Sequence, residues 1–458
     1  MLFGMCGIVG YAGSVLSPSG KPLEVCLQGL ERLEYRGYDS AGVALVAPGM
    51  DRVRVRKKAG RLSNLVADIE SDPLPEATVA IGHTRWATNG VPNDVNAHPH
   101  SSMDGRVAII HNGIIENASQ LRLDLQAEGY RFVSGTDTEV AAKLLGKIVD
   151  AVIAETGGPD LFEAVRRLGR MLEGAFTILA IDCRQPGVVV GARHDSPLVV
   201  GLGEGENYLG SDVAAFVAYT RTAMEIDQDQ AVMISAGGVT VTDFDGNVVE
   251  DPTVFEVDWD ASAAEKGGWD SFMDKEIHEE PAAVQRTLIG RLDDTGSINL
   301  DEVRIDEHDF TMIDKIIVIG CGTASYAGLV AKYAIEHWVR IPVEVELAHE
   351  FRYRDPILTP RTLVVAISQS GETMDTLMAL RHAREQGSKV LAICNTQGAS
   401  IPREADAVLY THAGPEVAVA STKAFVAQIT ATYVPVSYTH LTLPTMMATC
   451  RSRWSPYH

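Results

Sequence analysis

The residue near the start of the chain that is most suited to chemistry is Cys6, which opens the run Cys6–Gly10. If Met5 is the true start, its removal leaves Cys6 as the first residue. A thiolate is a strong nucleophile, and a free α-amino group has a pKa of about 7.7–8.0, close to neutral pH. One residue could then supply both the nucleophile and its base. Taken alone, Cys6 is explained equally well as a buried cysteine at the start of a strand.

Four further motifs place polar and aromatic side chains at turns and strand ends: Glu34–Gly42, Gly82–Thr88, Asn96–His100 and His111–Asn117. Attack on an amide produces an oxyanion that needs hydrogen-bond donors, and the side chain of Asn112 and the backbone of Gly113 could provide them. Arg85 could bind a carboxylate through its forked guanidinium, and Asp137 could bind an ammonium group. Each also has a simpler explanation, because Asn-Gly favours a hairpin turn, arginines form surface ion pairs and aspartates cap helices.

Together and in this order, the five motifs resemble the class II glutamine amidotransferase domain with an N-terminal nucleophile, over residues 6–250. The resemblance implies that Cys6 attacks glutamine and that Asn112 and Gly113 stabilise the oxyanion. It assigns the binding of glutamine to Arg36, Gly37, Arg85, Trp86, Thr88, His98 and Asp137. Trp86 would also gate a passage for ammonia. The resemblance implies no metal ion and no organic cofactor.

Two features depart from the pattern of that family. The residues Met1–Gly4 precede Met5, and if they stay attached, Cys6 has no α-amino group to act as its base. An over-extended start is the explanation that we favour. In addition, Asn89 stands where the family usually has histidine, which could change the contacts of the glutamine loop but not the nucleophile or the oxyanion hole.

Two loops later in the chain, Cys321–Ser325 and Ser368–Thr373, each follow an expected strand and precede an expected helix. Small residues and hydroxyl groups at the start of a helix suit a phosphate, because the backbone N–H groups there point at the anion. A dinucleotide fingerprint would need a third glycine where Ser325 stands, and the sequence has no G-x-x-x-x-G-K-[ST] loop for ATP. Helix capping by serine and threonine would explain either loop alone.

The two loops together resemble the sugar-isomerase (SIS) domain, over residues 270–430. The stretches Phe351–Arg354 and Val417–Phe425 resemble the branch of SIS domains found in the glutamine–fructose-6-phosphate aminotransferase family. The implied contacts to a hexose phosphate are Thr323, Ser368, Gln369, Ser370, Thr373, Val419 and Ser421. Relatives of full length have a second SIS domain with the lysine, glutamate and histidine of the sugar chemistry, and the 458 residues contain no such domain. Lys423 belongs to the first SIS domain and does not replace that lysine.

Short β-type runs separated by Gly, Pro, Asn and Asp dominate residues 6–250. Six of them are expected as strands: Cys6–Tyr11, Ala41–Val46, Val79–Gly82, Val107–His111, Ala175–Ile181 and Val188–Gly191. Hydrophobic spacing predicts helices over Pro22–Glu34 and Thr138–Ile148, the second introduced by a capping box at Thr136–Glu139. Strands and helices in separate blocks indicate an α+β fold, and the resemblance makes this the αββα glutaminase domain of the N-terminal-nucleophile (Ntn) hydrolases.

From about residue 310 the pattern becomes strand, loop, helix, with β-type runs at Lys315–Ile319, Thr362–Ile367 and Lys389–Cys394. This pattern predicts βαβ units with a parallel sheet, which the resemblance makes a flavodoxin-like α/β SIS domain. The expected division is an amidotransferase domain at 6–250, a linker with the start of a helix at 251–294, an incomplete first SIS domain at 295–435 and a tail at 436–458.

The linker and the tail differ from both domains in composition. Asp258–Trp269 is polar and rich in small residues, and Met273–Arg286 is expected to form a helix that Pro281 kinks or restarts. After Ala431 the helical pattern fails. The tail begins with VSYTHLTLPT, which resembles the translation of a sequencing adapter, so we expect that the tail is not natural.

The bulk composition excludes several classes of partner. The 39 basic and 61 acidic residues give a net charge of −22, which disfavours binding to nucleic acid or to anionic membranes. No run of about 18 apolar residues could span a membrane, and the start has no charged segment typical of a signal peptide. The six cysteines lack zinc-finger and C-x-x-C spacing, which indicates reduced thiols and a cytoplasmic location.

The resemblance implies an enzyme that transfers the amide nitrogen of L-glutamine to fructose 6-phosphate, giving glucosamine 6-phosphate and glutamate for amino-sugar synthesis. Relatives of full length are homodimers through their SIS parts. Without the second SIS domain, we expect the 458 residues to retain only glutaminase activity. Two alternatives stay open: an amidotransferase of another branch, which would lack the Ser368–Thr373 motif, and a phosphosugar-binding protein without enzymatic activity.

Overall fold

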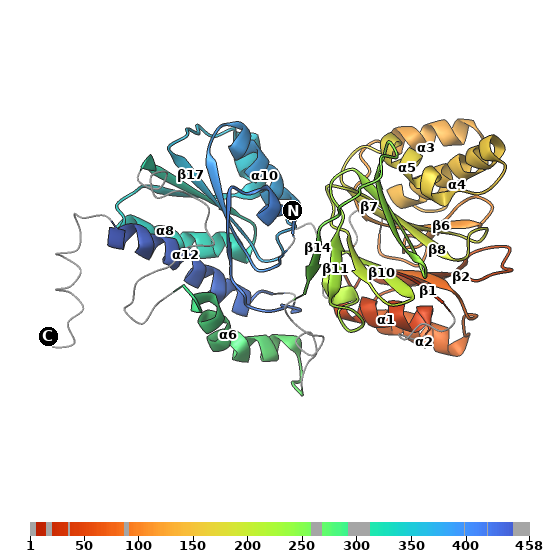
Figure 1. Cartoon of the computed structure of the whole chain (residues 1–458), viewed down its shortest axis with the longest axis horizontal. Coiled ribbons are helices and arrows are strands. Elements are labelled where there is room, and N and C mark those ends of the chain that lie inside the picture. The colour runs from red at the N-terminus through yellow and green to blue at the C-terminus, as the bar shows by residue number, and fades with distance from the viewer. Residues whose placement is uncertain are drawn as a thin grey trace. The chain divides into compact units, whose positions relative to one another are not determined.

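The computed structural model describes residues 6–14, 21–34, 37–86, 91–257, 268–291, 312–397, 399–418 and 420–442, with side chains up to Val434. The chain divides into two compact units, at residues 3–265 and 266–458 (Figure 1). Each unit has its own sheets and its own hydrophobic clusters, so each is described by itself.

Two antiparallel sheets form the first unit. The larger sheet, ordered β14-β11-β9-β10-β1-β4-β2-β3, contains β1 (Gly7–Gly13), β2 (Ser40–Val46), β3 (Arg54–Ala59), β4 (Val79–Arg85), β9 (Val199–Leu202), β10 (Glu206–Gly210), β11 (Thr222–Glu225) and β14 (Val254–Glu256). The smaller sheet, ordered β13-β12-β8-β7-β6-β5, contains β5 (His100–Ser101), β6 (Val107–Gly113), β7 (Phe176–Asp182), β8 (Val188–His194), β12 (Gln230–Ser235) and β13 (Gly238–Asp243). The helices are α1 (Pro22–Leu33), α2 (Leu62–Ser71), α3 (Ala118–Ala127), α4 (Asp137–Thr156), α5 (Leu161–Met171) and the 3-10 turn η2 (Val213–Ala215).

The two sheets face each other across an apolar core, and helices cover their outer faces (Figure 1). Alternate residues of a strand point to opposite faces, and β1 shows this clearly. Ile8 and Ala12 lie in the core between the sheets, whereas Val9 and Tyr11 pack with α1 and α2. On the other side, α4 and α5 pack on β6, β7 and β8. The expected αββα sandwich is confirmed.

The six strands expected from the sequence are all present, and five of them extend further toward their C-terminal ends. The strand β4 continues past Gly82 to Arg85, and β6 continues past His111 to Gly113. These extensions matter because their last residues reach the site described below.

The start of α4 follows the predicted cap only in part. The Thr136 hydroxyl accepts a hydrogen bond from the backbone of Glu139 at 3.3 Å, as expected. The Glu139 carboxylate, however, accepts from the backbone of Val133 and Ser134 and not from that of Thr136, whose N–H donates to the Ser134 hydroxyl. The helix also runs to Thr156 and not to Ile148, because its apolar face continues to pack on the sheet.

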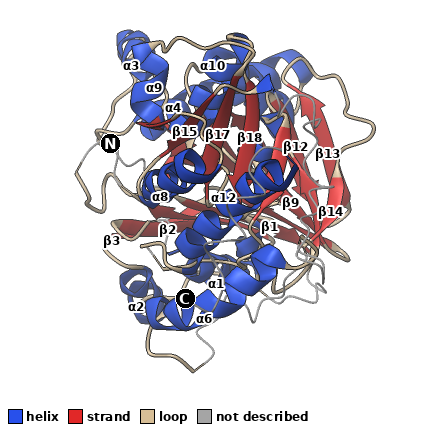
Figure 2. Ribbon diagram, turned by 90° about the vertical axis from the view of Figure 1, so that its left-hand side faces the viewer, coloured by secondary structure: helices blue, strands red, loops and turns tan. Residues whose placement is uncertain are grey.

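Five parallel strands ordered β16-β15-β17-β18-β19 form the sheet of the second unit, which confirms the predicted α/β architecture. They are β15 (Lys315–Gly320), β16 (Val343–Leu347), β17 (Thr362–Ser368), β18 (Lys389–Cys394) and β19 (Ala407–Tyr410). One face packs with α8 (Thr323–Trp338) and α12 (Lys423–Thr442), and the other with α9 (Ala348–Arg354), α10 (Met374–Glu385) and α11 (Ser400–Glu404) (Figure 2). The strand order reverses between β15 and β17, and ligands of such sheets bind at that switch point.

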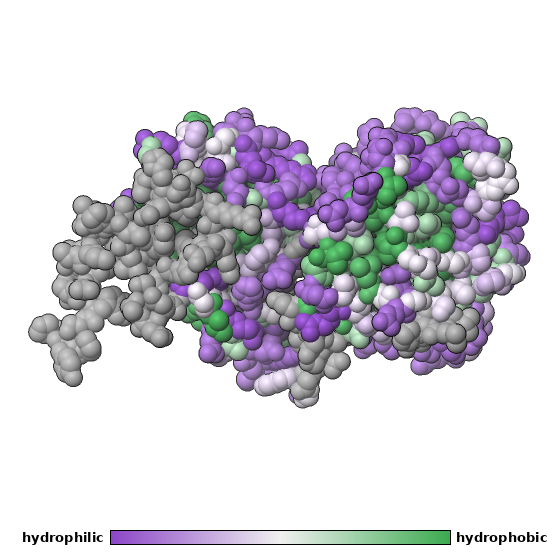
Figure 3. All heavy atoms as spheres, in the orientation of Figure 1, coloured by the Kyte–Doolittle hydropathy of each residue, from purple (hydrophilic) through white to green (hydrophobic). Residues whose placement is uncertain are grey.

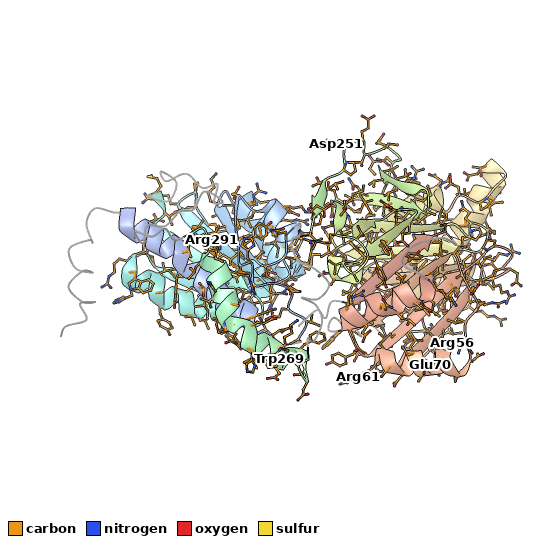
Figure 4. The ribbon with its side chains drawn as sticks, turned by 60° about the horizontal axis from the view of Figure 1, so that its bottom comes forward. Arg56, Arg61, Glu70, Asp251, Trp269 and Arg291 are labelled. Carbon is orange, nitrogen blue, oxygen red and sulfur yellow. The ribbon has the colours of Figure 1, made fainter. Side chains whose placement is uncertain are left out.

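The helix α6 (Phe272–Leu288) continues through Pro281 as a single element, so of the two expected effects of this proline, a kink or a restart, the restart is wrong. Proline removes only one hydrogen bond of the helix, and side chains near the C-terminal end fasten it to the unit. Arg286 donates to backbone carbonyl oxygens of the segment 410–413, with Nε 3.0 Å from its acceptor, and Arg291 (Figure 4) donates to the same segment at 2.7 Å.

The helix α12 continues past Ala431 to Thr442, so the expected loss of helix after Ala431 is also wrong. The buried residues Ala424, Ala427 and Ala431 fix the first turns of this helix. Extending an existing helix by one residue costs far less free energy than nucleating a new helix. The last turns can therefore form although their hydrophobic periodicity is weak. Most of the expected linker, 258–267, and residues 443–458 of the expected tail lie outside the described residues.

The surface of the described residues is that of a charged protein. None of the described helices combines the length and the apolar character that crossing a membrane requires. Hydrophilic residues cover much of the face drawn in Figure 3, in keeping with the 100 charged Lys, Arg, Asp and Glu residues (39 basic and 61 acidic). Hydrophobic areas interrupt this face over strands of the first unit.

Candidate active site

The Cys6 side chain lies at the start of β1, half-buried against the residue that follows β4. Its Sγ accepts a hydrogen bond from the backbone N–H of Trp86 at 3.1 Å and lies 3.5 Å from the Trp86 carbonyl oxygen. The strands β1 and β4 are antiparallel partners with Gly7 opposite Thr84. This register places Cys6 beside Arg85 and Trp86, so it brings the predicted nucleophile to two of the predicted glutamine-binding residues.

The predicted oxyanion pair, Asn112 and Gly113, ends strand β6 beside Cys6. The Nδ2 atom of Asn112 donates to the Cys6 carbonyl oxygen at 2.8 Å. An amide nitrogen has two hydrogens, so one remains for a substrate oxygen. Gly113 has a φ of +113°, and a Cβ there would lie 2.0 Å from the carbonyl oxygen of Ala175. Only glycine fits at this position.

The orientation of the Asn112 amide is set by His83 of β4. The Nε2 atom of His83 lies 3.1 Å from Oδ1 of Asn112 and 3.0 Å from the His111 carbonyl oxygen. Carbonyl oxygens only accept hydrogen bonds, so Nε2 bears the hydrogen and donates. Oδ1 of Asn112 therefore faces His83, and Nδ2 faces Cys6. Burial lowers the pKa of His83 to about 3, so this ring is neutral near pH 7.

Arg85 and Asp137 come from different elements, the end of β4 and the start of α4, yet their charges interact, and Arg85 also interacts with Cys6. Burial lowers the pKa of Arg85, and the charges of Cys6, Asp137 and Asp39 act in the opposite direction. Asp137 accepts a hydrogen bond from the backbone N–H of Ile115 at 3.0 Å. A largely buried cation thus lies within electrostatic range of the Cys6 thiol and of the Asp137 carboxylate.

Gly37 packs directly on the peptide that joins Arg85 to Trp86. A Cβ at this position would lie 2.6 Å from the Arg85 carbonyl carbon and 2.8 Å from the Trp86 nitrogen. The close approach explains why glycine stands here, and it fixes the peptide that hydrogen-bonds to Cys6. Two other predicted glutamine-binding residues, Arg36 and Thr88, lie outside the described residues.

Four buried histidines, His83, His98, His100 and His111, form a cluster behind this site. The ring centroid of His98 lies 4.3 Å from that of His83, 5.3 Å from that of His100 and 6.4 Å from that of His111. Burial lowers the pKa of all four rings. Sequence analysis assigns only His98 to the site, because a histidine inside a buried strand or loop has no spacing signal of its own.

Lys57 of β3 fastens the loop that contains His98. Its Nζ donates to the carbonyl oxygens of Val95, Ala97 and Pro99 at 3.1, 2.6 and 3.0 Å. Burial lowers the pKa of Lys57 to about 8. Sequence analysis misses this residue too, because its three partners are backbone atoms about 40 positions away in the sequence.

The two predicted phosphate loops follow adjacent parallel strands of the second unit. Loop 321–323 follows β15 and loop 368–373 follows β17, so both lie at the switch point of the sheet. Oγ of Ser368 accepts from the Gly371 N–H at 3.0 Å and lies 3.2 Å from Oγ1 of Thr373. Gly371 turns the chain with a φ of +68°. The second loop thus places hydroxyl groups before the first turn of α10.

The remaining residues of these loops are accessible. Thr323, the first residue of α8, is exposed, and Gln369 and Ser370 are half-buried. Oγ of Ser370 accepts from the Glu372 N–H at 3.2 Å, which leaves its own hydroxyl hydrogen for another acceptor. An anion could therefore meet side-chain hydroxyls and helix N-termini together.

Ser421 lies in the segment 416–424, which two glutamates hold. Glu416 accepts from the Ser421 hydroxyl at 2.8 Å and from backbone N–H groups at the start of α12, at 2.9 and 3.1 Å. Glu276 of α6 accepts from two further backbone N–H groups of the segment at 2.6 and 3.0 Å, and burial raises its pKa. Val419, the other predicted sugar contact here, lies outside the described residues.

Comparison with known proteins gives concordant results for both units. Residues 51–243 match the model of a glutamine amidotransferase domain, and residues 310–437 match that of a SIS domain. The glutamine–fructose-6-phosphate aminotransferases (isomerizing) of Corynebacterium diphtheriae and Corynebacterium efficiens are 61% and 62% identical over 432 and 431 residues, which are 94% of this chain and 68% of each relative. A solved C-terminal domain of glucosamine-fructose-6-phosphate aminotransferase from Francisella tularensis is 40% identical, covering 39% of this chain and 51% of that chain with a TM-score of 0.37.

Proposed function

The chain belongs to the glutamine–fructose-6-phosphate aminotransferase family, and from this premise we propose that it takes the amide nitrogen of L-glutamine at Cys6 and delivers it to fructose 6-phosphate. The products are glutamate and glucosamine 6-phosphate. The observation that most supports the proposal is the contact of 2.8 Å between the Asn112 amide and Cys6, which puts an oxyanion donor beside the nucleophile.

The first half of the reaction is an acyl transfer. The Cys6 thiolate attacks the amide carbon of glutamine, and the electron pair of the C=O bond moves to the oxygen. This oxyanion accepts hydrogen bonds from Nδ2 of Asn112 and from the backbone N–H of Gly113. The C–N bond then breaks as the nitrogen takes a proton from the α-ammonium group of Cys6, which releases ammonia and leaves a glutamyl thioester. Water hydrolyses the thioester to glutamate.

Recognition of glutamine as a free amino acid requires a cation for its α-carboxylate and an anion for its α-ammonium group. Arg85 supplies the cation and Asp137 the anion, and the two charges lie close enough to interact. Gly37 keeps the Arg85–Trp86 peptide in place, and His98 supports the site from behind. The resemblance adds Arg36 and Thr88 to the set, together with a gating role for Trp86.

The second half of the reaction needs a phosphosugar beside the released ammonia. We assign the phosphate to the hydroxyls and helix N-termini of the loops after β15 and β17, because small loops at a switch point leave backbone N–H groups accessible to an anion. The residues are Thr323, Ser368, Gln369, Ser370 and Thr373, with Val419 and Ser421 nearer the sugar.

The proposal for Cys6 is tested by intact-mass measurement of the expressed chain before and after treatment with an electrophilic glutamine analogue. A chain that begins at Cys6 and gains one adduct, with no adduct in a Cys6→Ala variant, supports the N-terminal nucleophile. A chain that keeps Met1–Gly4 and gains no adduct contradicts it. Free glutamine in excess should slow the labelling, because both compounds compete for Arg85 and Asp137.

A further inference from the structure

Three metal-ligating side chains of different kinds meet in the second unit, and the reaction proposed above uses none of them. Sγ of Cys321, a ring nitrogen of His349 and a carboxylate oxygen of Asp375 all lie within 4.8 Å of one another. All three residues are half-buried, so an ion from solvent can reach them.

The topology of the sheet brings these residues together from distant parts of the sequence. Cys321 directly follows β15, His349 lies two residues after the end of β16, and Asp375 lies in the first turn of α10, after β17. The three strands are neighbours in the order β16-β15-β17 and run parallel. Their C-terminal ends therefore meet at one edge, where α/β sheets bind their ligands.

The sulfur atom of Cys321 sits among hydrogen-bond donors. Oγ1 of Thr376 donates to Sγ at 3.8 Å, and the backbone N–H groups of Ala348 and His349 donate to it as well. Burial raises the pKa of the Cys321 thiol, and these hydrogen bonds act in the opposite direction. A metal ion that binds the sulfur displaces the thiol proton, because the thiolate is the form of cysteine that binds metal ions. His349 would thus contribute twice, through its ring as a ligand and through its backbone as support for the second ligand.

The donor set and its size fit a borderline-soft divalent ion. Tetrahedral zinc with bonds of about 2.0–2.3 Å places its ligand atoms about 3.3–3.6 Å apart. Atoms up to 4.8 Å apart need to close by at most about 1.5 Å, which rotation of the half-buried His349 and Asp375 side chains can supply. We propose that Cys321, His349 and Asp375 bind one divalent transition-metal ion of the zinc class, with the fourth coordination position left to water or another ligand.

The test uses cobalt(II) as the probe, because tetrahedral cobalt with a thiolate ligand absorbs visible light and shows a sulfur-to-metal charge-transfer band. The full 458-residue chain with Cys6→Ser and Cys450→Ser serves as background, since Cys26, Cys183 and Cys394 are buried. We expect one cobalt ion per chain with a thiolate band, and displacement of the band by zinc.

Three variants in this background identify the ligands. Cys321→Ser should abolish the thiolate band, and His349→Ala and Asp375→Asn should each weaken cobalt binding by at least about tenfold. His337→Ala, which removes an exposed histidine at the end of α8, is the matched control and should leave binding unchanged. Circular dichroism shows whether each variant is folded.

Two outcomes would overturn the proposal. One is a background chain that shows no thiolate–cobalt band at cobalt concentrations that saturate other cobalt–cysteine sites. The other is a band that persists in folded His349→Ala and Cys321→Ser chains. Neither outcome bears on the glutaminase or on the phosphosugar loops, because the titration requires neither glutamine nor a sugar.

Discussion

At the scale of single residues, His83 acts on the proposed reaction through Asn112 and not through the substrate. We predict that His83→Leu lowers kcat for glutamine hydrolysis by about tenfold or more, with a smaller change in KM. The amide of Asn112 would lose the donor that holds Oδ1, and outright loss of an oxyanion donor costs about 100–1,000-fold. Steady-state glutaminase kinetics measure both constants.

His83→Gln is the informative control, because a glutamine amide can also donate to Oδ1 of Asn112. It should recover part of the lost kcat. A His83→Leu variant with an unchanged kcat and a raised KM would show instead that His83 contributes to glutamine binding.

The four buried histidines make stability depend on pH. The pKa of His83 is about 3 in the folded chain and about 6.5 in the unfolded chain, and burial lowers the pKa of the other three as well. Between these values the unfolded chain binds more protons, so the free energy of unfolding falls as the pH decreases below about 6.5. Each histidine contributes up to about 1.4 kcal/mol per pH unit.

Urea unfolding of the first unit at a series of pH values from neutral to mildly acidic measures this slope. His98→Asn should reduce the slope, because it removes one buried histidine whose pKa is lowered. Equal slopes for the original chain and the His98→Asn chain would contradict the account.

Sequence analysis can identify residues that belong to local motifs but not those that support them from a distance. Cys6, Arg85 and Asn112 lie in short motifs, and the structure brings all three together. His83 and Lys57 act through contacts with atoms 28 to 42 positions away, so only the strand register reveals them.

At the scale of elements, the end of β6 tolerates only glycine at position 113. We predict that Gly113→Ala destabilises the first unit by more than about 2 kcal/mol and removes most glutaminase activity. The alanine Cβ would overlap the carbonyl oxygen of Ala175, and the alanine backbone would have to adopt a φ of +113°. Denaturant unfolding and glutamine hydrolysis measure the two effects.

Gly129→Ala provides the matched comparison, because Gly129 also has a positive φ, +92°, but no atom lies within 4 Å of the added Cβ. Gly129→Ala should lower the free energy of unfolding by about 1 kcal/mol, from the backbone conformation alone, and should leave glutaminase activity unchanged. Similar effects of both substitutions would show that the contact with Ala175 does not matter.

The contact between α6 and the segment 416–424 predicts an effect on the sugar phosphate. Glu276→Ala should weaken the binding of fructose 6-phosphate by about tenfold, because two buried backbone N–H groups lose their acceptor and the segment that contains Ser421 loosens. Isothermal titration with fructose 6-phosphate measures this. Glu280→Ala, one turn further along the same helix, is the control, and equal affinities of the two variants would contradict the prediction.

The predicted elements agree with the structure where the hydrophobic periodicity of a segment and the turn residues at its ends indicate the same element. The strand β1 and the βαβ pattern after residue 310 are examples. The predicted and observed elements differ where tertiary contacts determine how far a helix extends. The end of α4 at Thr156 depends on packing against the sheet, and α6 continues through Pro281 because its far end is fastened to β19 and the segment after it.

At the scale of the whole molecule, the 458 residues correspond to 68% of the length of the curated relatives. We predict that a polypeptide of these 458 residues hydrolyses glutamine but forms little glucosamine 6-phosphate, because about a third of the relatives' length is outside it. Coupled assays for glutamate and for glucosamine 6-phosphate on the same preparation measure the ratio. Equimolar formation of the two products would contradict the prediction.

Every hydrophobic cluster among the described residues lies wholly within one unit, three in the first and three in the second. Neither core therefore borrows side chains from the other half of the chain. The consequence concerns inheritance: a gene for such a protein can be divided or recombined between the units without repacking either core. A nitrogen-releasing half could in this way acquire a new acceptor half by gene fusion while its own core stays intact.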